Sequence, residues 1–112
     1  MSTLEMLANH TITKTGLSSA EITEELLALG RRWTVVAPDL KLELPGPMTK
    51  TGAVAAFAGA LADELDHHPV ITLEFAGLTL AIHTHDAKGL TVIDLIFAAR
   101  LETWLRSNGF PA

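Results

Sequence analysis

The strongest constraint on the fold is the recurrence of large apolar residues at every second position in the two segments 71–75 and 78–82. Apolar residues occupy every second position on both sides of the dipeptide Ala76-Gly77. This pattern predicts two antiparallel strands joined by a tight turn, with one face of the hairpin buried. A two-residue turn at Ala76-Gly77 would pair Phe75 with Leu78 on the buried face. The alternating apolar residues are Ile71, Leu73, Phe75, Leu78, Leu80 and Ile82.

A second pair of strands is expected upstream, at residues 33–36 and 40–44. Both segments are rich in residues that favour strands, and Ala37-Pro38-Asp39 between them is typical of a turn. In the second segment three leucines alternate with Lys41 and Glu43, which indicates one buried and one exposed face. Pro45-Gly46-Pro47 should end this strand, because proline has no N–H to donate to a neighbouring strand.

Three helices are expected around these strands. The first begins after Ser18, which can cap the helix while Glu21 closes a capping box, and it ends near Leu29. The second covers about residues 49–65 and carries one apolar stripe. The third begins after Thr91, has Asp94 at its third position, and ends near residue 107.

The predicted order is therefore helix, strand, strand, helix, strand, strand, helix. This order predicts an α+β fold in which a four-stranded, antiparallel-rich sheet carries three helices on one face. The 112 residues are 48% hydrophobic, which is enough for one core and too little for two domains. We expect the domain to span residues 17–108, followed by a tail at 109–112. Residues 1–16 show no sustained period, so this N-terminal extension need not be ordered.

Charge and cysteine content narrow the range of functions. The formal net charge is −5 and the eight basic residues are scattered, so we expect no nucleic-acid surface. The lack of cysteine excludes disulfides and thiolate metal ligands and is compatible with a reducing cytosol. No signal sequence is visible, and the longest uncharged apolar stretch, residues 51–62, is shorter than the roughly 20 residues of a membrane span. We therefore expect a cytoplasmic protein without a membrane segment.

Four of the five histidines lie between residues 63 and 94. Histidine exchanges protons near neutral pH, so this clustering marks the region in which a function should be sought. The four histidines are His67, His68, His83 and His85, and the acids Asp63, Glu64, Asp66 and Asp94 flank them.

Three interpretations of the cluster compete. A metal site could use His83 and His85 with a carboxylate and another histidine, but no helical HExxH-type pair is present. A purely structural role would suit a single histidine better than four. The third interpretation is proton-transfer catalysis, which needs imidazoles and no metal. Asp94 alone is also explained by helix capping.

The acids and histidines also follow a fixed spacing. Three residues separate Asp63 from His67-His68-Pro69, five more precede Phe75, nine separate Phe75 from His85, and eight separate His85 from Asp94. This pattern resembles the signature of the pterin-4a-carbinolamine dehydratases at every gap. Residues 84–91 also look like the turn between hairpin and helix in that family, and the resemblance covers about residues 17–105.

The resemblance implies a reaction and a set of site residues. The family dehydrates a 4a-hydroxytetrahydropterin to the quinonoid dihydropterin, with no metal or organic cofactor. By resemblance, His67 and His85 would be the acid and base, and His68 would position the pterin. Asp63 and Asp94 would orient imidazoles. The groups implied in substrate binding are Asp66, His67, His68 and the segment His83, Thr84, His85 and Asp86.

The resemblance also leaves an alternative of another class. Some relatives act as a dimerisation cofactor for a transcription factor or look like assembly factors for RuBisCO, so a binding protein on the same fold is the rival interpretation. The chain departs from the usual family pattern at Ile71, where an aromatic residue is common, and in its alanine-rich second helix. Either role is compatible with a homodimer or homotetramer, with Phe97 or Trp104 of the nearly all-apolar last helix at the contact.

Overall fold

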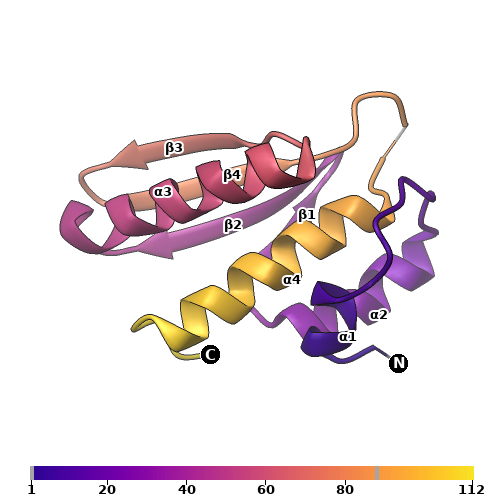
Figure 1. Cartoon of the computed structure of the whole chain (residues 1–112), viewed down its shortest axis with the longest axis horizontal. Helices are drawn as coiled ribbons and strands as arrows, with labels where there is room; N and C mark the ends of the chain where they lie inside the picture. The colour runs from indigo at the N-terminus through magenta and orange to yellow at the C-terminus, as the bar shows by residue number, and fades with distance from the viewer. Residues whose placement is uncertain (1, 88) are drawn as a thin grey trace.

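The computed structural model describes residues 2–87 and 89–112. These residues form four helices and a four-stranded sheet (Figure 1). The helices are α1 (Leu4–Ala8), α2 (Ser19–Leu29), α3 (Met48–Leu65) and α4 (Val92–Ser107), and the strands are β1 (Trp33–Val36), β2 (Asp39–Pro45), β3 (Val70–Glu74) and β4 (Gly77–Ile82). Within the described residues no helix combines the length and apolarity that crossing a membrane would require.

The strand order in the sheet is β1-β2-β4-β3, and every neighbouring pair is antiparallel. The two predicted hairpins are therefore joined through their second strands, β2 and β4. Helices α3 and α4 lie over one face of the sheet, while α1 and α2 flank α4 (Figure 1). The α+β class and the sheet are confirmed, but the number of helices is one higher than predicted.

The additional helix is α1, in the segment that we expected to be an extension without regular structure. Thr3 caps its first turn, and its Leu7 is buried against the domain. The Arg100 guanidinium of α4 donates a hydrogen bond of 2.9 Å to the carbonyl of Ala8. Nearby, the N–H of Val92 donates to the carbonyl of Thr15. A helix of five residues is too short to show a helical period in the sequence, so the pattern could not reveal it.

The capping signals predict the starts of α2 and α4 correctly. The Ser18 hydroxyl accepts a hydrogen bond from the N–H of Glu21, and the Glu21 carboxylate accepts one from the N–H of Ser18. These hydrogen bonds hold the pKa of the Glu21 carboxyl below its usual value. Gly30 follows the last turn of α2 with a positive φ of 97°, a conformation that suits glycine.

The β3–β4 hairpin differs from its predicted register. Glu74 pairs with Gly77 and Leu73 with Leu78, so the turn residues are Phe75 and Ala76. Phe75 is 94% exposed, and the prediction that it lies on the core face was wrong. Gly77 has a φ of 153°, and a Cβ at this position would come within 2.5 Å of the Leu44 carbonyl oxygen. The close approach of β2 therefore fixes where β4 begins. The observed pairing of β3 with β4 differs from the predicted one by two positions, and because side chains alternate between faces, the same residues of each strand still share a face.

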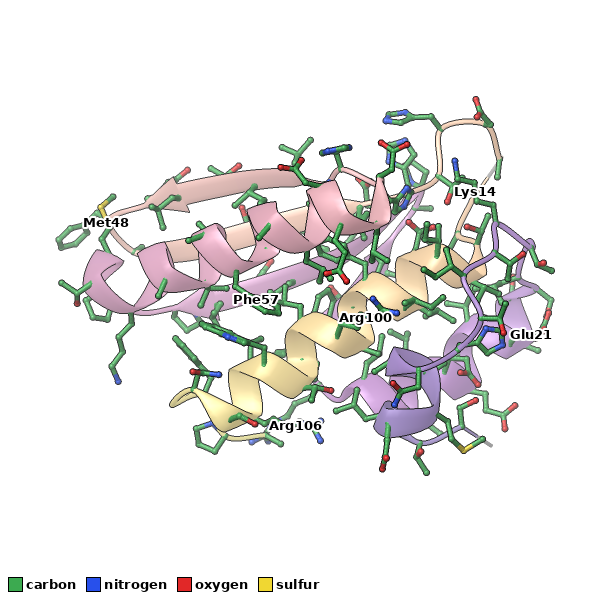
Figure 2. The ribbon with its side chains drawn as sticks, viewed as in Figure 1. Lys14, Glu21, Met48, Phe57, Arg100 and Arg106 are labelled. Atoms are coloured by element: carbon green, nitrogen blue, oxygen red, sulfur yellow. The ribbon has the colours of Figure 1, made fainter. Side chains whose placement is uncertain are left out.

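The last helix is covered by the chain itself. Phe97 and Leu101 have no exposed surface. Trp104 stacks on Phe57 of α3, with ring centroids 4.8 Å apart, and Phe57 points toward α4 (Figure 2). Phe97 is fully buried within the chain, so the prediction that it lies at a contact between subunits was wrong. Trp104 is only partly buried, and its place at such a contact, like self-association itself, stays a prediction.

A buried carboxylate ties α4 to β1 and to the C-terminus. Glu102 is 1% exposed and accepts hydrogen bonds from Arg32 at 2.7 and 3.0 Å, from the Trp33 indole at 2.9 Å and from Arg106 at 2.7 Å. Arg32 also donates to the carbonyl of Phe110. Burial by itself raises the pKa of the Glu102 carboxyl, but the donors from Arg32, Arg106 and Trp33 outweigh it and leave the pKa below its usual value.

Glu102→Gln should therefore destabilise the fold. The variant leaves the Arg32 and Arg106 guanidinium groups without their counter-charge, so we expect the free energy of unfolding to fall by about 3 kcal/mol. Urea unfolding followed by tryptophan fluorescence measures this change. The matched control is Glu64→Gln, since Glu64 is 69% exposed and lies 3.8 Å from Arg100; its effect should stay within about 0.5 kcal/mol. Equal effects in the two variants would contradict the role of Glu102.

The lowered pKa of Glu102 also predicts a pH dependence of stability. Because the folded pKa lies below the unfolded value of about 4.3, the stabilisation is complete above that pH and is lost as pH falls through the folded pKa. We expect the urea midpoint of the wild type to drop as the pH is lowered below about 4, and the midpoint of Glu102→Gln to drop less. Parallel curves for the two proteins would exclude this carboxyl as a cause.

Candidate active site

The predicted site residues gather at one end of the molecule. The C-terminal end of α3, the turn between β1 and β2, the loop after β4 and the start of α4 all lie at this end (Figure 1). Side-chain hydrogen bonds from His67 to Asp94, from His83 to Asp39 and from Thr84 to Asp94 show that these segments are in contact. The antiparallel pairing of β2 with β4 brings the β1–β2 turn to the place where β4 ends.

Asp94 is the most buried charged residue of this region. It has no exposed surface, and it lies in the first turn of α4. One carboxylate oxygen, Oδ2, accepts hydrogen bonds from the Thr84 hydroxyl at 2.8 Å and from the Thr91 N–H at 2.9 Å. The other oxygen, Oδ1, lies 2.6 Å from Nε2 of His67. A buried carboxylate needs such donors, because burial of an uncompensated charge is strongly unfavourable.

The direction of these hydrogen bonds follows from the chemistry of the groups. An ionised carboxylate only accepts, so Thr84 and His67 must both donate to Asp94. The Thr84 hydroxyl lies 2.7 Å from the Thr91 hydroxyl. Thr84 has already given its proton to Asp94, so Thr91 donates to Thr84. The bond to Asp94 occupies Nε2 of His67 and leaves Nδ1 as the nitrogen that can exchange a proton.

The backbone at the end of α3 places His67 against Asp94. Asp66 adopts a left-handed conformation with φ 48° and ψ 47°, which ends the helix. Aspartate tolerates this conformation better than most residues. The N–H of His67 then bonds to the carbonyl of Ala62 at 3.0 Å, so the turn is closed and the His67 side chain is 7% exposed.

His68 leaves the same turn toward solvent. Its Nε2 lies 3.0 Å from Oδ1 of Asp63, but the two side chains are 58% and 83% exposed. Solvent weakens such a pair, so Asp63 restrains His68 much less than Asp94 restrains His67.

The other two histidines form a separate group after β4. Nδ1 of His83 lies 2.7 Å from Oδ1 of Asp39, at the start of β2. The His83 and His85 rings are 4.5 Å apart and meet edge to face at 68°. His85 and Asp86 are exposed in the following turn. Asp39, which we expected only in a turn, was not predicted as a site residue, because the pairing of β2 with β4 does not follow from the sequences of two separate hairpins.

The structure thus shows three histidine–carboxylate pairs, two of them between predicted residues and the third between His83 and Asp39, while His85 contacts the ring of His83. Asp66 is exposed at the end of α3, and the hydroxyl of Thr84 contacts Asp94, whereas we expected Thr84 to contact the substrate. In residues 2–87 and 89–112 no group of three or more metal-ligating side chains is arranged to hold an ion. The individual roles of these residues remain predictions.

Comparisons with known proteins identify the class to which this arrangement belongs. Residues 15–104 match the model of a family described as pterin 4 alpha carbinolamine dehydratase. A protein of Chloroflexus aggregans is 35% identical over 95 residues, which cover 77% of this chain and 93% of that protein. A protein of Streptomyces coelicolor is 34% identical over 95 residues, covering 83% and 93%. Both are named "Putative pterin-4-alpha-carbinolamine dehydratase".

A solved structure shares the fold. The crystal structure of a transcriptional coactivator/pterin dehydratase from Brucella melitensis superposes with a TM-score of 0.71 at 24% sequence identity, and covers 78% of this chain and 95% of that one. The chain belongs to the pterin 4 alpha carbinolamine dehydratase family. The resemblance seen in the spacing of its acids and histidines is confirmed.

Thr84→Val tests the support of the buried carboxylate. Valine keeps the shape of the side chain but removes the hydroxyl, so we expect the free energy of unfolding to fall by about 1–3 kcal/mol. Thr72→Val on the exposed strand β3 is the control and should change stability by less than about 0.5 kcal/mol. Urea unfolding measures both. A loss no larger than that of the control would show that Asp94 does not depend on Thr84.

Proposed function

We propose that this protein dehydrates a 4a-hydroxytetrahydropterin to the quinonoid dihydropterin by histidine general acid and base catalysis, and so recycles a pterin cofactor. The proposal rests on membership of the family and on the arrangement of the histidines. The single observation that carries it is the contact between His67 and the fully buried Asp94. An uncharged helix cap would satisfy the backbone equally well, so a buried charge facing an imidazole points to chemistry.

The reaction breaks one carbon–oxygen bond and forms one carbon–nitrogen double bond. The hydroxyl on the ring carbon leaves as water after it takes a proton from a general acid. The neighbouring ring nitrogen loses its proton to a general base, and its electrons form the new double bond. Each positioned proton transfer contributes on the order of 10²–10⁴ in rate. Imidazoles suit both steps, because they hold and release protons near neutral pH.

In this proposal His67 and His85 carry the two proton transfers. Asp94 fixes the His67 ring and keeps its proton on Nε2, so that Nδ1 is the nitrogen that exchanges a proton with the substrate. His85 reaches the substrate from the exposed turn after β4. His68, whose ring is more than half exposed, would contact the pterin rather than move protons. The backbone at Asp66 and at residues 83–86 would bind the polar edge of the pterin.

Substitution of the two histidines tests the proposal. With a chemically prepared 4a-hydroxytetrahydropterin, His67→Ala and His85→Ala should each lower the rate of quinonoid dihydropterin formation at least roughly tenfold. His10→Ala is the control, because His10 is exposed and bonds only locally to the Thr11 carbonyl. Its rate should equal that of the wild type. A wild-type protein that is no faster than buffer would refute the proposed function.

The proposed chemistry requires no metal ion. We expect full activity after dialysis against a chelator, with metal content measured by elemental analysis before and after. Loss of activity together with a stoichiometric metal, and its return when that metal is added back, would favour the metal interpretation instead.

A binding or assembly role on the same fold is the second candidate. The name of the Brucella protein includes a coactivator function, and the β3–β4 hairpin of this chain exposes Val70, Leu73 and Phe75. A binding role does not need the imidazoles. The catalytic variants therefore separate the two candidates, because a partner would still bind His67→Ala if binding were the function.

A further inference from the structure

The carboxylate of Asp39 and the ring of His83 form a pair that the family signature does not contain. The signature residues are Asp63, His67, His68, His85 and Asp94, together with Pro69 and Phe75. We propose that Asp39 and His83 are positioning residues that hold the His85 imidazole in place for proton transfer. This inference rests on the proposed function and adds a group of residues to it.

The pairing of β2 with β4 brings Asp39 and His83 next to each other. Leu40 of β2 lies opposite Ile82 of β4 in the antiparallel ladder, so Asp39 and His83 are the next residues along their two strands. Their side chains project from the face opposite the leucines, because neighbouring residues of a strand alternate between faces. Oδ1 of Asp39 and Nδ1 of His83 are 2.7 Å apart. The side chains are 31% and 30% exposed, so the pair is partly shielded from water.

The hydrogen bond fixes both the tautomer and the orientation of His83. An ionised Asp39 only accepts, so Nδ1 of His83 carries a proton. With Nδ1 held, the imidazole cannot rotate freely, and its ring presents a fixed surface to His85. The two rings are 4.5 Å apart at 68°, which is the edge-to-face arrangement that aromatic rings favour.

His85 depends on such a neighbour because of where it lies. It is exposed in the turn after β4, whereas His67 is held by a buried carboxylate. An exposed side chain samples several rotamers, and a general acid or base displaced by about 1 Å can lose on the order of 10² in rate. The ring of His83 limits this freedom from one side, and Asp39 limits the freedom of His83.

A set of single and double variants tests whether Asp39 acts through His83, and His83 through His85. Asp39→Ala and His83→Ala should each lower kcat by roughly fivefold to fiftyfold, with KM changed less than about twofold, since misplacement of a proton-transfer group affects the chemical step. Asp39→Asn keeps an acceptor oxygen and should recover part of the loss. Glu43→Gln is the control. It removes an exposed carboxylate from the same strand, β2, and its kcat should equal that of the wild type.

The decisive variants carry His85→Ala as well. If Asp39 and His83 act only through His85, then Asp39→Ala and His83→Ala should cause no further loss of kcat in that background. A loss of the same factor with and without His85 would overturn the inference, and so would unchanged kcat in both single variants. A merely structural role would lower stability without this dependence on His85.

Nuclear magnetic resonance separates failure of the inference from failure of the proposed function. Long-range ¹H–¹⁵N spectra should show the proton of His83 on Nδ1 in the wild type, and proton–proton contacts between the His83 and His85 rings. Both signals should be lost in Asp39→Ala and kept in Glu43→Gln. These spectra can be measured whether or not the protein is catalytically active. If the ring contacts persist in Asp39→Ala, the positioning role is wrong even where the enzyme is active.

Discussion

The buried carboxylate of Asp94 is the interaction on which the candidate site depends. An ionised carboxylate in a protein interior costs several kcal/mol in lost hydration unless donors replace the water. Here the hydroxyl of Thr84, the N–H of Thr91 and the imidazole of His67 replace it, at distances from 2.6 to 2.9 Å. The same carboxylate lies in the first turn of α4, where the helix dipole favours a negative charge. Asp94 thus caps the start of α4, bonds to Thr84 in the loop after β4 and holds the ring of His67.

Helix α4 carries the two buried carboxylates described in this structure, and they have different consequences. Asp94, near its N-terminal end, faces the hydroxyl of Thr84 and the imidazole of His67, which can exchange a proton. Glu102, two turns later, faces the guanidinium groups of Arg32 and Arg106, which keep their protons. The first arrangement suits catalysis, and the second fixes β1 and the C-terminal residues to the core. His67 therefore bonds to a helix that is held to other segments near both of its ends.

Much of the fold could be predicted from local patterns. Capping residues such as Ser18 and Thr91 predicted helix starts correctly, and alternation along β2 and β4 predicted which leucines are buried. Features that depend on contacts between distant segments were missed. The register of the β3–β4 hairpin depends on the backbone of β2 close to Gly77. The burial of Phe97 depends on segments that cover α4 from several sides, including a helix too short to show a period.

The candidate site shows the same limit. Spacing alone was enough to single out the histidines, because a family signature fixes residue types at fixed separations. Asp39 could not be identified as a site residue from the sequence, because its partner His83 lies 44 positions away and only the order of the strands brings them together. The hydroxyl of Thr84 was also missed as a group that acts on Asp94, because a threonine at the end of a strand has no distinctive sequence signal.

The most direct test of the central claim is the dehydration rate of Asp94→Asn, compared with the wild type on 4a-hydroxytetrahydropterin. Asparagine keeps the shape, but its amide presents a donor to Nε2 of His67 and so favours the proton on Nδ1, the wrong nitrogen for the reaction. We expect a folded protein whose kcat is lower by on the order of 10²–10⁴, because an oriented acid or base is lost. A folded Asp94→Asn protein with the wild-type rate would show that catalysis does not depend on the contact between Asp94 and His67.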